Sequence, residues 1–142
     1  MKFIIVFDTD ISEAWTVLPD SVGLINDRPL FVPDFDNGAV GYAAVAVKIT
    51  RLGKCIEERF AHRYHTEYAP ALVVMPSSAA QMLENGVTPP ATELCFDSAV
   101  VTGRWTVHDT DNCDIPHYEF THYDSPITID CSVINRTIER VS

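Results

Sequence analysis

A continuous apolar run, VGYAAVAVKI at residues 40–49, constrains the fold of this chain more than any other stretch. It contains three valines and ends in isoleucine, and Gly38 and Gly53 lie on either side of it. Its length and its β-branched residues favour a strand over a helix, and its lack of alternation predicts that both faces are covered. The interior of a sheet is therefore the expected place for this segment.

The rest of the pattern predicts more strands and only two short helices. Residues 56–64 form one helix candidate, and PSSAAQMLENG forms the other, with Ser78 and Gln81 as a capping box and Gly86 as the C-terminal cap. Further strands are expected at residues 3–7, 30–32, 99–107, 118–123 and 127–134. A turn through Pro33-Asp34 follows the second of these, and the last pairs as a hairpin with 137–141 through a turn at Asn135-Arg136. Because strands dominate and do not alternate with helices, the expected fold is α+β and mainly β.

Length and charge narrow the class of protein. A chain of 142 residues predicts a single domain, residues 1–142, that can bury a substantial core. Its net charge of −10 disfavours nucleic acids and anionic membranes, both of which need a basic surface. The first apolar run has only five residues, whereas a membrane-spanning helix needs about 20, so we expect a cytoplasmic protein.

The densest group of chemically active residues lies at 108–124, HDTDNCDIPHYEFTHYD. His108, Cys113, His117 and His122 carry imidazole and thiol groups that can bind a transition metal. The spacing fits no common zinc motif, and residues five apart on a strand point to opposite faces. A solvated acidic loop followed by a half-exposed strand explains the same residues, so both interpretations stay open.

Two other groups of polar residues have simple structural explanations. His62 and His65 lie close in sequence to Glu58, but histidines at a helix end near a carboxylate are more often structural than catalytic. Ser77 and Ser78 lack the glycines of a nucleophile elbow, and helix capping accounts for Ser78. Neither group predicts a reaction.

Three stretches together resemble the fumarylacetoacetate hydrolase family: LPDSVGLINDRPLFVPDF, KITRLGKCIEERFAHRY and CFDSAVVTGRW. The similarity is greatest to the bacterial branch of hydroxyhepta-dienedioate isomerases and acylpyruvate hydrolases. It covers roughly residues 15–107, and CSVINRTIERVS resembles the strand pair that follows. The resemblance implies a partial, mixed β-roll that corresponds to a truncated member of the family. An unrelated β domain with chance similarity is the alternative.

The resemblance also implies where a metal site would lie. Members of the family bind Mg²⁺ or Mn²⁺ through three carboxylates, two of them from a Glu-x-Glu pair on a strand. In this sequence the pair falls on Ala43 and Val45, and the third carboxylate falls on Val73 or Val74. The family's lysine falls on Leu94. Hard cations need oxygen ligands, so the alignment predicts no catalytic residues, no bound metal and no cofactor.

Two polar residues still match the family's pattern. Tyr42 aligns with the tyrosine that precedes the Glu-x-Glu pair, and Asp97 aligns with an aspartate that follows the lysine. We therefore expect a vestigial pocket that contains Tyr42 and Asp97.

Three functional hypotheses follow from the sequence. The first is a catalytically inactive binding, regulatory or accessory subunit, present as a homodimer or as a hetero-oligomer with a full-length relative. The second is a hydrolase or isomerase of 2-oxo or diketo acids whose site has moved to residues 108–124. The third is a structural module without a ligand of its own.

Overall fold

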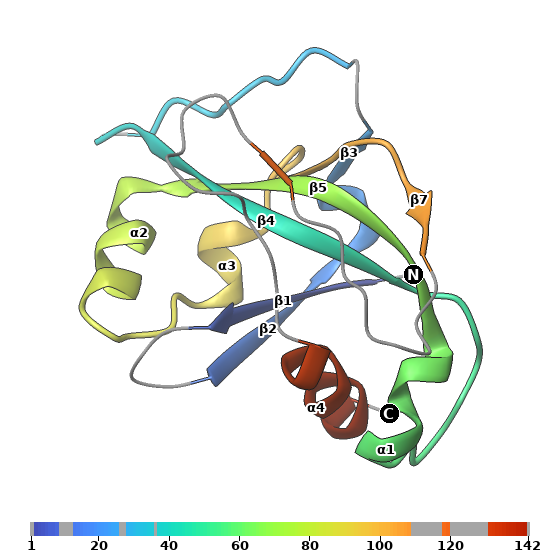
Figure 1. Ribbon diagram of the computed structural model, residues 1–142. Helices are drawn as coiled ribbons and strands as arrows, with labels where there is room; N and C mark the ends of the chain where they lie inside the picture. The colour runs from blue at the N-terminus through green and yellow to red at the C-terminus, as the bar shows by residue number, and fades with distance from the viewer. Residues whose placement is uncertain are drawn as a thin grey trace. The chain divides into compact units, whose positions relative to one another are not determined.

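The computed structural model describes residues 2–8, 13–25, 28–35, 37–108, 118–119 and 131–141. The strands are β1 (Lys2–Asp8), β2 (Glu13–Pro19), β3 (Gly23–Ile25), β4 (Ala39–Ile49), β5 (His65–Pro76), β6 (Val100–Thr102) and β7 (Thr106–Val107) (Figure 1). The helices are α1 (Glu58–Ala61), α2 (Ser77–Glu84), α3 (Ala91–Leu94) and α4 (Cys131–Val141), with 3-10 turns η1 (Asp20–Val22) and η2 (His62–Tyr64). Strands outweigh short helices, so the predicted α+β class is confirmed.

The strands form two sheets. Strands β1 and β2 pair antiparallel in a two-stranded sheet. The second sheet has the order β3-β6-β5-β4, and β7 also pairs with β5. It is mixed, because β3 runs parallel to β6 whereas β7 runs antiparallel to β5.

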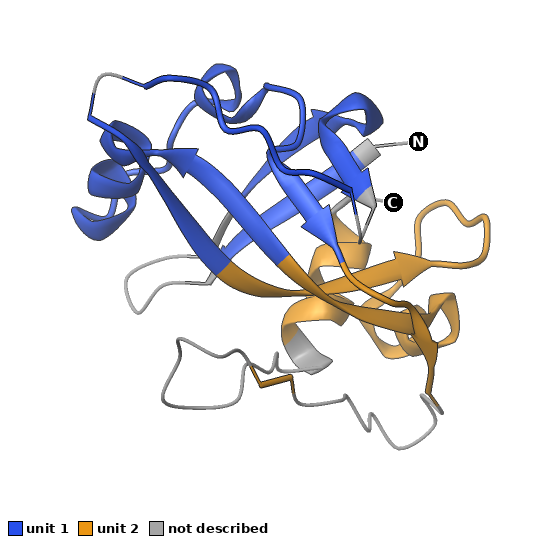
Figure 2. Cartoon of the chain, turned by 90° about the horizontal axis from the view of Figure 1, so that it is seen from above, with its two compact units in different colours: residues 1–42, 72–102 blue, residues 43–71, 103–142 orange. Residues whose placement is uncertain are grey.

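The chain divides into two compact units, which Figure 2 distinguishes by colour. Unit 1 consists of residues 1–42 and 72–102, and unit 2 consists of residues 43–71 and 103–142. Strands β4 and β5 each contribute residues to both units. Whether the chain behaves as a single domain stays a prediction, and each unit is described by itself below.

The core of unit 1 includes the second half of β5 and the start of α2. Its buried apolar residues are Leu18, Val22, Val73, Val74, Met75, Ala79, Ala80, Leu94, Ala99 and Val100. Helix α2 begins directly after Pro76 and ends at Glu84, and two residues later Gly86 has a φ of 75°, the left-handed conformation that glycine adopts without strain. The Gly86 N–H donates to the Leu83 carbonyl at 3.0 Å and closes the last turn.

The core of unit 2 joins α1, α4 and the first half of β5. Ile56, Ala61, Tyr68, Ile134 and Ile138 form one buried apolar cluster. Burying an aliphatic side chain stabilises a fold by roughly 1.5–3 kcal/mol, so the two isoleucines of α4 contribute substantially to this unit. Within the described ranges, no helix is long and apolar enough to cross a membrane.

Several predicted elements are confirmed. A strand spans residues 3–7, another spans 40–49, and helical turns occupy most of 56–64. The expectation that 40–49 is covered on both faces is only partly met, since its residues 42–47 are half-buried. Residues 30–32 form no strand. Helices α3 and α4 were not predicted, and with them four α-helices lie within the described ranges.

The predicted C-terminal hairpin is wrong where the structure describes it. Residues 131–141 form helix α4, and Asn135-Arg136 lies within that helix rather than in a turn. Val133, Ile134 and Ile138 are buried, a spacing that fits one face of a helix. Residues 120–130 of the predicted strands lie outside the described residues.

Candidate functional site

The positions that the resemblance aligns with the Glu-x-Glu pair lie on β4. Ala43 and Val45 are both half-buried, and Val45 packs against the apolar cluster of unit 2. Neither side chain has an atom that can coordinate a cation. Val45 instead contributes to a hydrophobic contact.

The positions aligned with the third carboxylate and the lysine belong to the core of unit 1. Val73 and Val74 are 7% and 4% exposed, and Leu94 is fully buried. The Val74 N–H donates to the Ala99 carbonyl at 2.8 Å, so this backbone group already has a partner. These residues fill the interior and present no ligand atoms from their side chains.

The predicted vestigial pocket of Tyr42 and Asp97 stays a prediction. Tyr42 is half-buried in β4, and Asp97 is exposed in the turn that follows α3. The next residue, Ser98, has a φ of 70°, a conformation that few residues other than glycine adopt.

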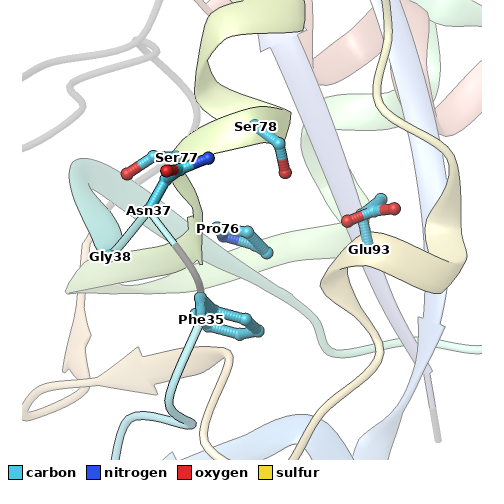
Figure 3. Close-up of a pocket in the computed structure, with 7 residues that line it drawn as sticks. All are labelled: Phe35, Asn37, Gly38, Pro76, Ser77, Ser78 and Glu93. Carbon is cyan, nitrogen blue, oxygen red and sulfur yellow. The ribbon is translucent and has the colours of Figure 1, made fainter.

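A hollow of about 260 Å³ lies in unit 1 at the start of α2 (Figure 3). Its lining residues are Phe35, Asn37, Gly38, Pro76, Ser77, Ser78 and Glu93. Tyr42 and Asp97 are not among them. In Figure 3 the Ser78 hydroxyl and the Glu93 carboxylate extend into the same space from opposite sides.

The polar groups of this hollow remain largely in contact with solvent. Ser78 and Glu93 are exposed, and Ser77 is half-buried. The Ser77 N–H donates to the Gly38 carbonyl at 3.0 Å. The predicted capping box is wrong, because the residue at the N-cap is Pro76 and no side chain caps the helix. An open hollow with exposed groups offers little desolvation to activate a nucleophile or an acid.

A buried polar network lies in unit 2. His65 and Tyr68 are both fully buried on β5. The His65 Nδ1 lies 2.7 Å from the Tyr68 hydroxyl, and its Nε2 lies 3.2 Å from the Asn135 Oδ1 on α4. The two rings meet edge to face at 5.9 Å. The network joins residues that are 70 positions apart in the chain.

The hydrogen bonds place a hydrogen on one nitrogen of this ring. The Asn135 Oδ1 can only accept, so Nε2 carries a hydrogen and donates it. The Tyr68 hydroxyl donates to Nδ1 when the ring is neutral and can accept from it when the ring is protonated. Burial lowers the pKa of His65 from its ordinary value of 6.5, and the nearby His62 lowers it further, against the effect of Asn135. Burial raises the pKa of Tyr68 to about 12, with a smaller contribution from Tyr118.

Of the predicted relocated site, only His108 lies within the described residues; Cys113, His117 and His122 lie outside them. The His108 ring lies edge to face with Tyr68 at 5.8 Å, and its Nε2 is 3.0 Å from the Thr106 Oγ1. Across the described ranges, no three histidine, cysteine or acidic side chains come together in a group that could hold a metal.

The sequence did not reveal the His65 network. The nearby Glu58 drew attention to His65, but the ring bonds to Tyr68 and Asn135. A histidine and a tyrosine three residues apart in HTEY were the only local signal, and the Asn135 partner depends on α4 being a helix. The structural role expected for this histidine agrees with its burial.

No family model and no curated protein matches this sequence. Solved structures do match. The protein Cg1458 is 12% identical, with a TM-score of 0.67, and the match covers 99% of this chain and 58% of that one. A protein from Yersinia pestis that is provisionally assigned to the fumarylacetoacetate hydrolase family is 20% identical, with a TM-score of 0.56, over 70% of this chain and 46% of that one.

A third match is the fumarylpyruvate hydrolase from Pseudomonas aeruginosa, which was solved in complex with Mn²⁺ and pyruvate. It is 17% identical, with a TM-score of 0.52, over 66% of this chain and 42% of that one. The chain thus spans about half the length of the structures that it matches. At these identities the matches establish the fold, and the chain has the α+β fold of fumarylacetoacetate hydrolase family structures.

Proposed function

We propose that this chain is a non-catalytic form of the fumarylacetoacetate hydrolase fold that acts as a binding, regulatory or accessory subunit. The observation that carries the proposal is the chemistry of the aligned ligand positions. Ala43, Val45, Val73 and Val74 have no oxygen, nitrogen or sulfur in their side chains. The last two are buried in an apolar core, which makes a compensating rearrangement there costly.

Mg²⁺ and Mn²⁺ place strict requirements on the residues that bind them. Both ions prefer oxygen ligands in near-octahedral geometry, and protein sites normally supply at least one or two carboxylates. Removing water from a divalent ion without replacing it by such ligands costs far more than a folded domain can offset. A 2-oxo acid held by the metal would lose its binding site together with the metal.

Three large apolar side chains are exposed and are places at which association can be tested. Leu52 is completely exposed, Phe31 is 78% exposed, and Val107 is 74% exposed. Covering such a side chain with a partner is favourable, although single exposed apolar residues are also ordinary on monomers. We propose a second copy of this chain or a full-length relative with the same fold as the partner.

An activity screen tests the loss of catalysis. Purified protein is incubated with fumarylpyruvate and other acylpyruvates in the presence of Mn²⁺, and the loss of the diketo acid is followed by absorbance. The fumarylpyruvate hydrolase from Pseudomonas aeruginosa serves as the positive control. We expect no turnover above the protein-free rate. Mn²⁺-dependent turnover that a chelator abolishes would contradict the proposal.

The same screen tests the relocated-site hypothesis. Any turnover that persists after Mn²⁺ is removed is measured again in the variants His108→Ala, Cys113→Ala, His117→Ala and His122→Ala. Loss of turnover in these variants would place the chemistry in residues 108–124 and replace the non-catalytic proposal.

Sedimentation equilibrium at micromolar concentration tests the proposed association. A homodimer has twice the chain mass of 15.8 kDa. A clean monomer would exclude the homodimer and leave the full-length relative, which is tested by mixing the two purified proteins.

A further inference from the structure

The segment at residues 28–34, RPLFVPD, is exposed along its whole length in unit 1. Leu30, Phe31 and Val32 at its centre are 38%, 78% and 44% exposed. The sequence predicts a strand at residues 30–32, but the structure forms none there, and Figure 1 draws an open path between β3 and β4. Among the described residues, no strand pairs with this segment, so its preference for strand geometry is not met within the chain.

The backbone of this segment can pair along one edge only. Among the described residues, none bonds to the backbone N–H of Leu30 or Val32. In a strand, the N–H and C=O groups of alternate residues point to opposite edges, so the even-numbered residues of 28–34 share one edge. Pro29 and Pro33 lie on the other edge and have no N–H to donate. The even-numbered edge is therefore the one that can accept a second strand.

The two prolines also hold the segment close to strand geometry before it pairs. Each proline fixes its own φ at about −65°, and each disfavours helical geometry at the residue before it. Arg28, Pro29, Val32 and Pro33 are restricted in this way. Less conformational entropy is then lost when the segment pairs with another strand.

The segment is complementary to itself when two copies run antiparallel. A twofold axis at Phe31 places that residue opposite the same residue of the second copy, and Leu30 opposite Val32. The same axis places Arg28 opposite Asp34, so opposite charges meet at both ends. The segment thus matches a second copy of itself in shape and in charge.

The hydrogen-bond pattern of antiparallel strands fits this register. Opposed residues alternate between pairs that exchange two hydrogen bonds and pairs that exchange none. When Phe31 is in a non-bonded pair, Pro29 and Pro33 fall in non-bonded pairs as well, where no N–H is needed. Leu30 and Val32 then form the bonded pairs on either side of the axis. Side chains lie closer together in non-bonded pairs, which favours contact between the two phenylalanine rings.

We propose that residues 28–34 pair with the same segment of a second copy, as antiparallel strands about a twofold axis at Phe31. This rests on the association with a second copy proposed above, and it names the surface that makes the contact. Because the prolines leave only one edge of each segment able to pair, the assembly closes at two copies and does not extend into a fibre.

Sedimentation equilibrium at micromolar concentration tests the backbone pairing. The parent protein should be a dimer. Leu30→Pro removes an N–H that bonds only between copies, whereas Leu30→Ala keeps this N–H and shortens the same side chain. We expect Leu30→Pro to raise the dissociation constant of the dimer at least about tenfold, and Leu30→Ala to raise it less. Leu52→Ala, at an exposed residue of unit 2, should leave the dimer unchanged.

Exchanging the charges tests the antiparallel direction. Arg28→Asp and Asp34→Arg each place like charges opposite one another at both ends, so each variant alone should form a dimer several-fold weaker than the parent. An equimolar mixture of the two variants should recover the affinity of the parent, because opposite charges again meet at both ends. The double exchange within one chain should recover it as well.

Oxidative cross-linking tests the register. Opposed residues in a non-bonded pair have Cα atoms about 4.5 Å apart, which a disulfide can bridge. Phe31→Cys should therefore cross-link two copies, whereas Val32→Cys, opposite Leu30, should cross-link far less. The parent, with its own four cysteines, is the control under the same oxidation.

A monomeric parent would overturn the proposal, and so would a Leu30→Pro dimer as tight as that of Leu30→Ala. A mixture of the charge variants that associates no better than either alone would contradict the antiparallel direction. Equal cross-linking of Phe31→Cys and Val32→Cys would contradict the register. A dimer that Leu52→Ala weakens and Leu30→Pro does not would overturn the strand pairing while leaving the association with a second copy intact.

Discussion

The two halves of strand β5 bury different kinds of side chain, apolar in one half and partly polar in the other. Residues 72–76, in unit 1, bury Val73, Val74 and Met75, although the resemblance expects an aspartate there. Residues 65–71, in unit 2, bury His65 and Tyr68 and give both ring nitrogens a partner. Both buried polar side chains in this half of β5 therefore have a hydrogen-bond partner. Its aligned metal-binding positions carry no polar side-chain groups at all.

The largest expected effect comes from placing a carboxylate in the apolar half. Val74→Asp should lower the free energy of unfolding by at least about 3 kcal/mol at pH 7, because the group is buried without a partner. Val74→Ala is the matched control and should cost about 2 kcal/mol. Urea unfolding measures both. Equal losses in the two variants would mean that this half of β5 tolerates charge.

A somewhat smaller loss is expected when the Glu-x-Glu pair is restored. Ala43→Glu combined with Val45→Glu should cost about 2 kcal/mol at pH 7, since both sites are half-buried and Val45 packs on an apolar cluster. Burial raises the pKa of a carboxyl group, so the loss should shrink as the pH falls towards 5. The Gln pair is the uncharged control. A double Glu variant as stable as the parent at pH 7 would show that this face is solvated.

In the polar half, Tyr68→Phe removes the hydroxyl that donates to His65. The buried Nδ1 then lacks a donor, and the free energy of unfolding should fall by about 1–2 kcal/mol at pH 7. Tyr64→Phe, at a residue that packs against the same cluster, is the control and should cost less. A loss no larger than that of Tyr64→Phe would mean that the network adds no stability.

Tyr68→Phe should also change how the free energy of unfolding depends on pH in alkaline solution. The pKa of Tyr68 is raised to about 12 from an ordinary value of 10.0, so the unfolded chain loses its proton first. The resulting stability is complete below pH 10 and is lost as the pH rises through about 12. Tyr68→Phe should remove this part of the alkaline decline, as measured by urea unfolding at pH 9 and pH 11. An identical decline in parent and variant would contradict it.

The smallest effect is expected at Ser78. A serine that caps a helix contributes about 1 kcal/mol, but Ser78 is exposed and makes no capping bond. Ser78→Ala should therefore change the free energy of unfolding by less than about 0.5 kcal/mol. A loss of 1 kcal/mol or more would restore the capping box that the sequence predicts.

Local patterns and family resemblance predicted much of this fold. The apolar run at 40–49 is a strand, and Gly86 has the left-handed conformation predicted for it just beyond the end of α2. Helix α4 was missed because valine, isoleucine and threonine favour strands, and its packing against α1 overrides that preference. In the helix, the Thr137 hydroxyl bonds to the Val133 carbonyl at 2.8 Å.

The candidate site likewise contains features that could be predicted from the sequence and features that could not. The apolar character of positions 43, 45, 73 and 74 could be read from the alignment, because it depends on residue identity. The hydrogen-bond partner of His65 could not be predicted in this way. Asn135 lies 70 residues away, on a segment that was predicted as a turn between strands but forms a helix. A polar network between distant segments leaves little trace in a single sequence.

Calorimetric titration with Mn²⁺ measures whether this chain binds the metal at all. MnCl₂ is titrated into the protein at pH 7.5, and in parallel into a His117→Ala/His122→Ala variant and into the fumarylpyruvate hydrolase from Pseudomonas aeruginosa. We expect this chain to give only the heat of dilution, because its aligned positions carry alanine and valine. One-to-one saturable binding that survives in the double histidine variant and is reversed by chelator would contradict it.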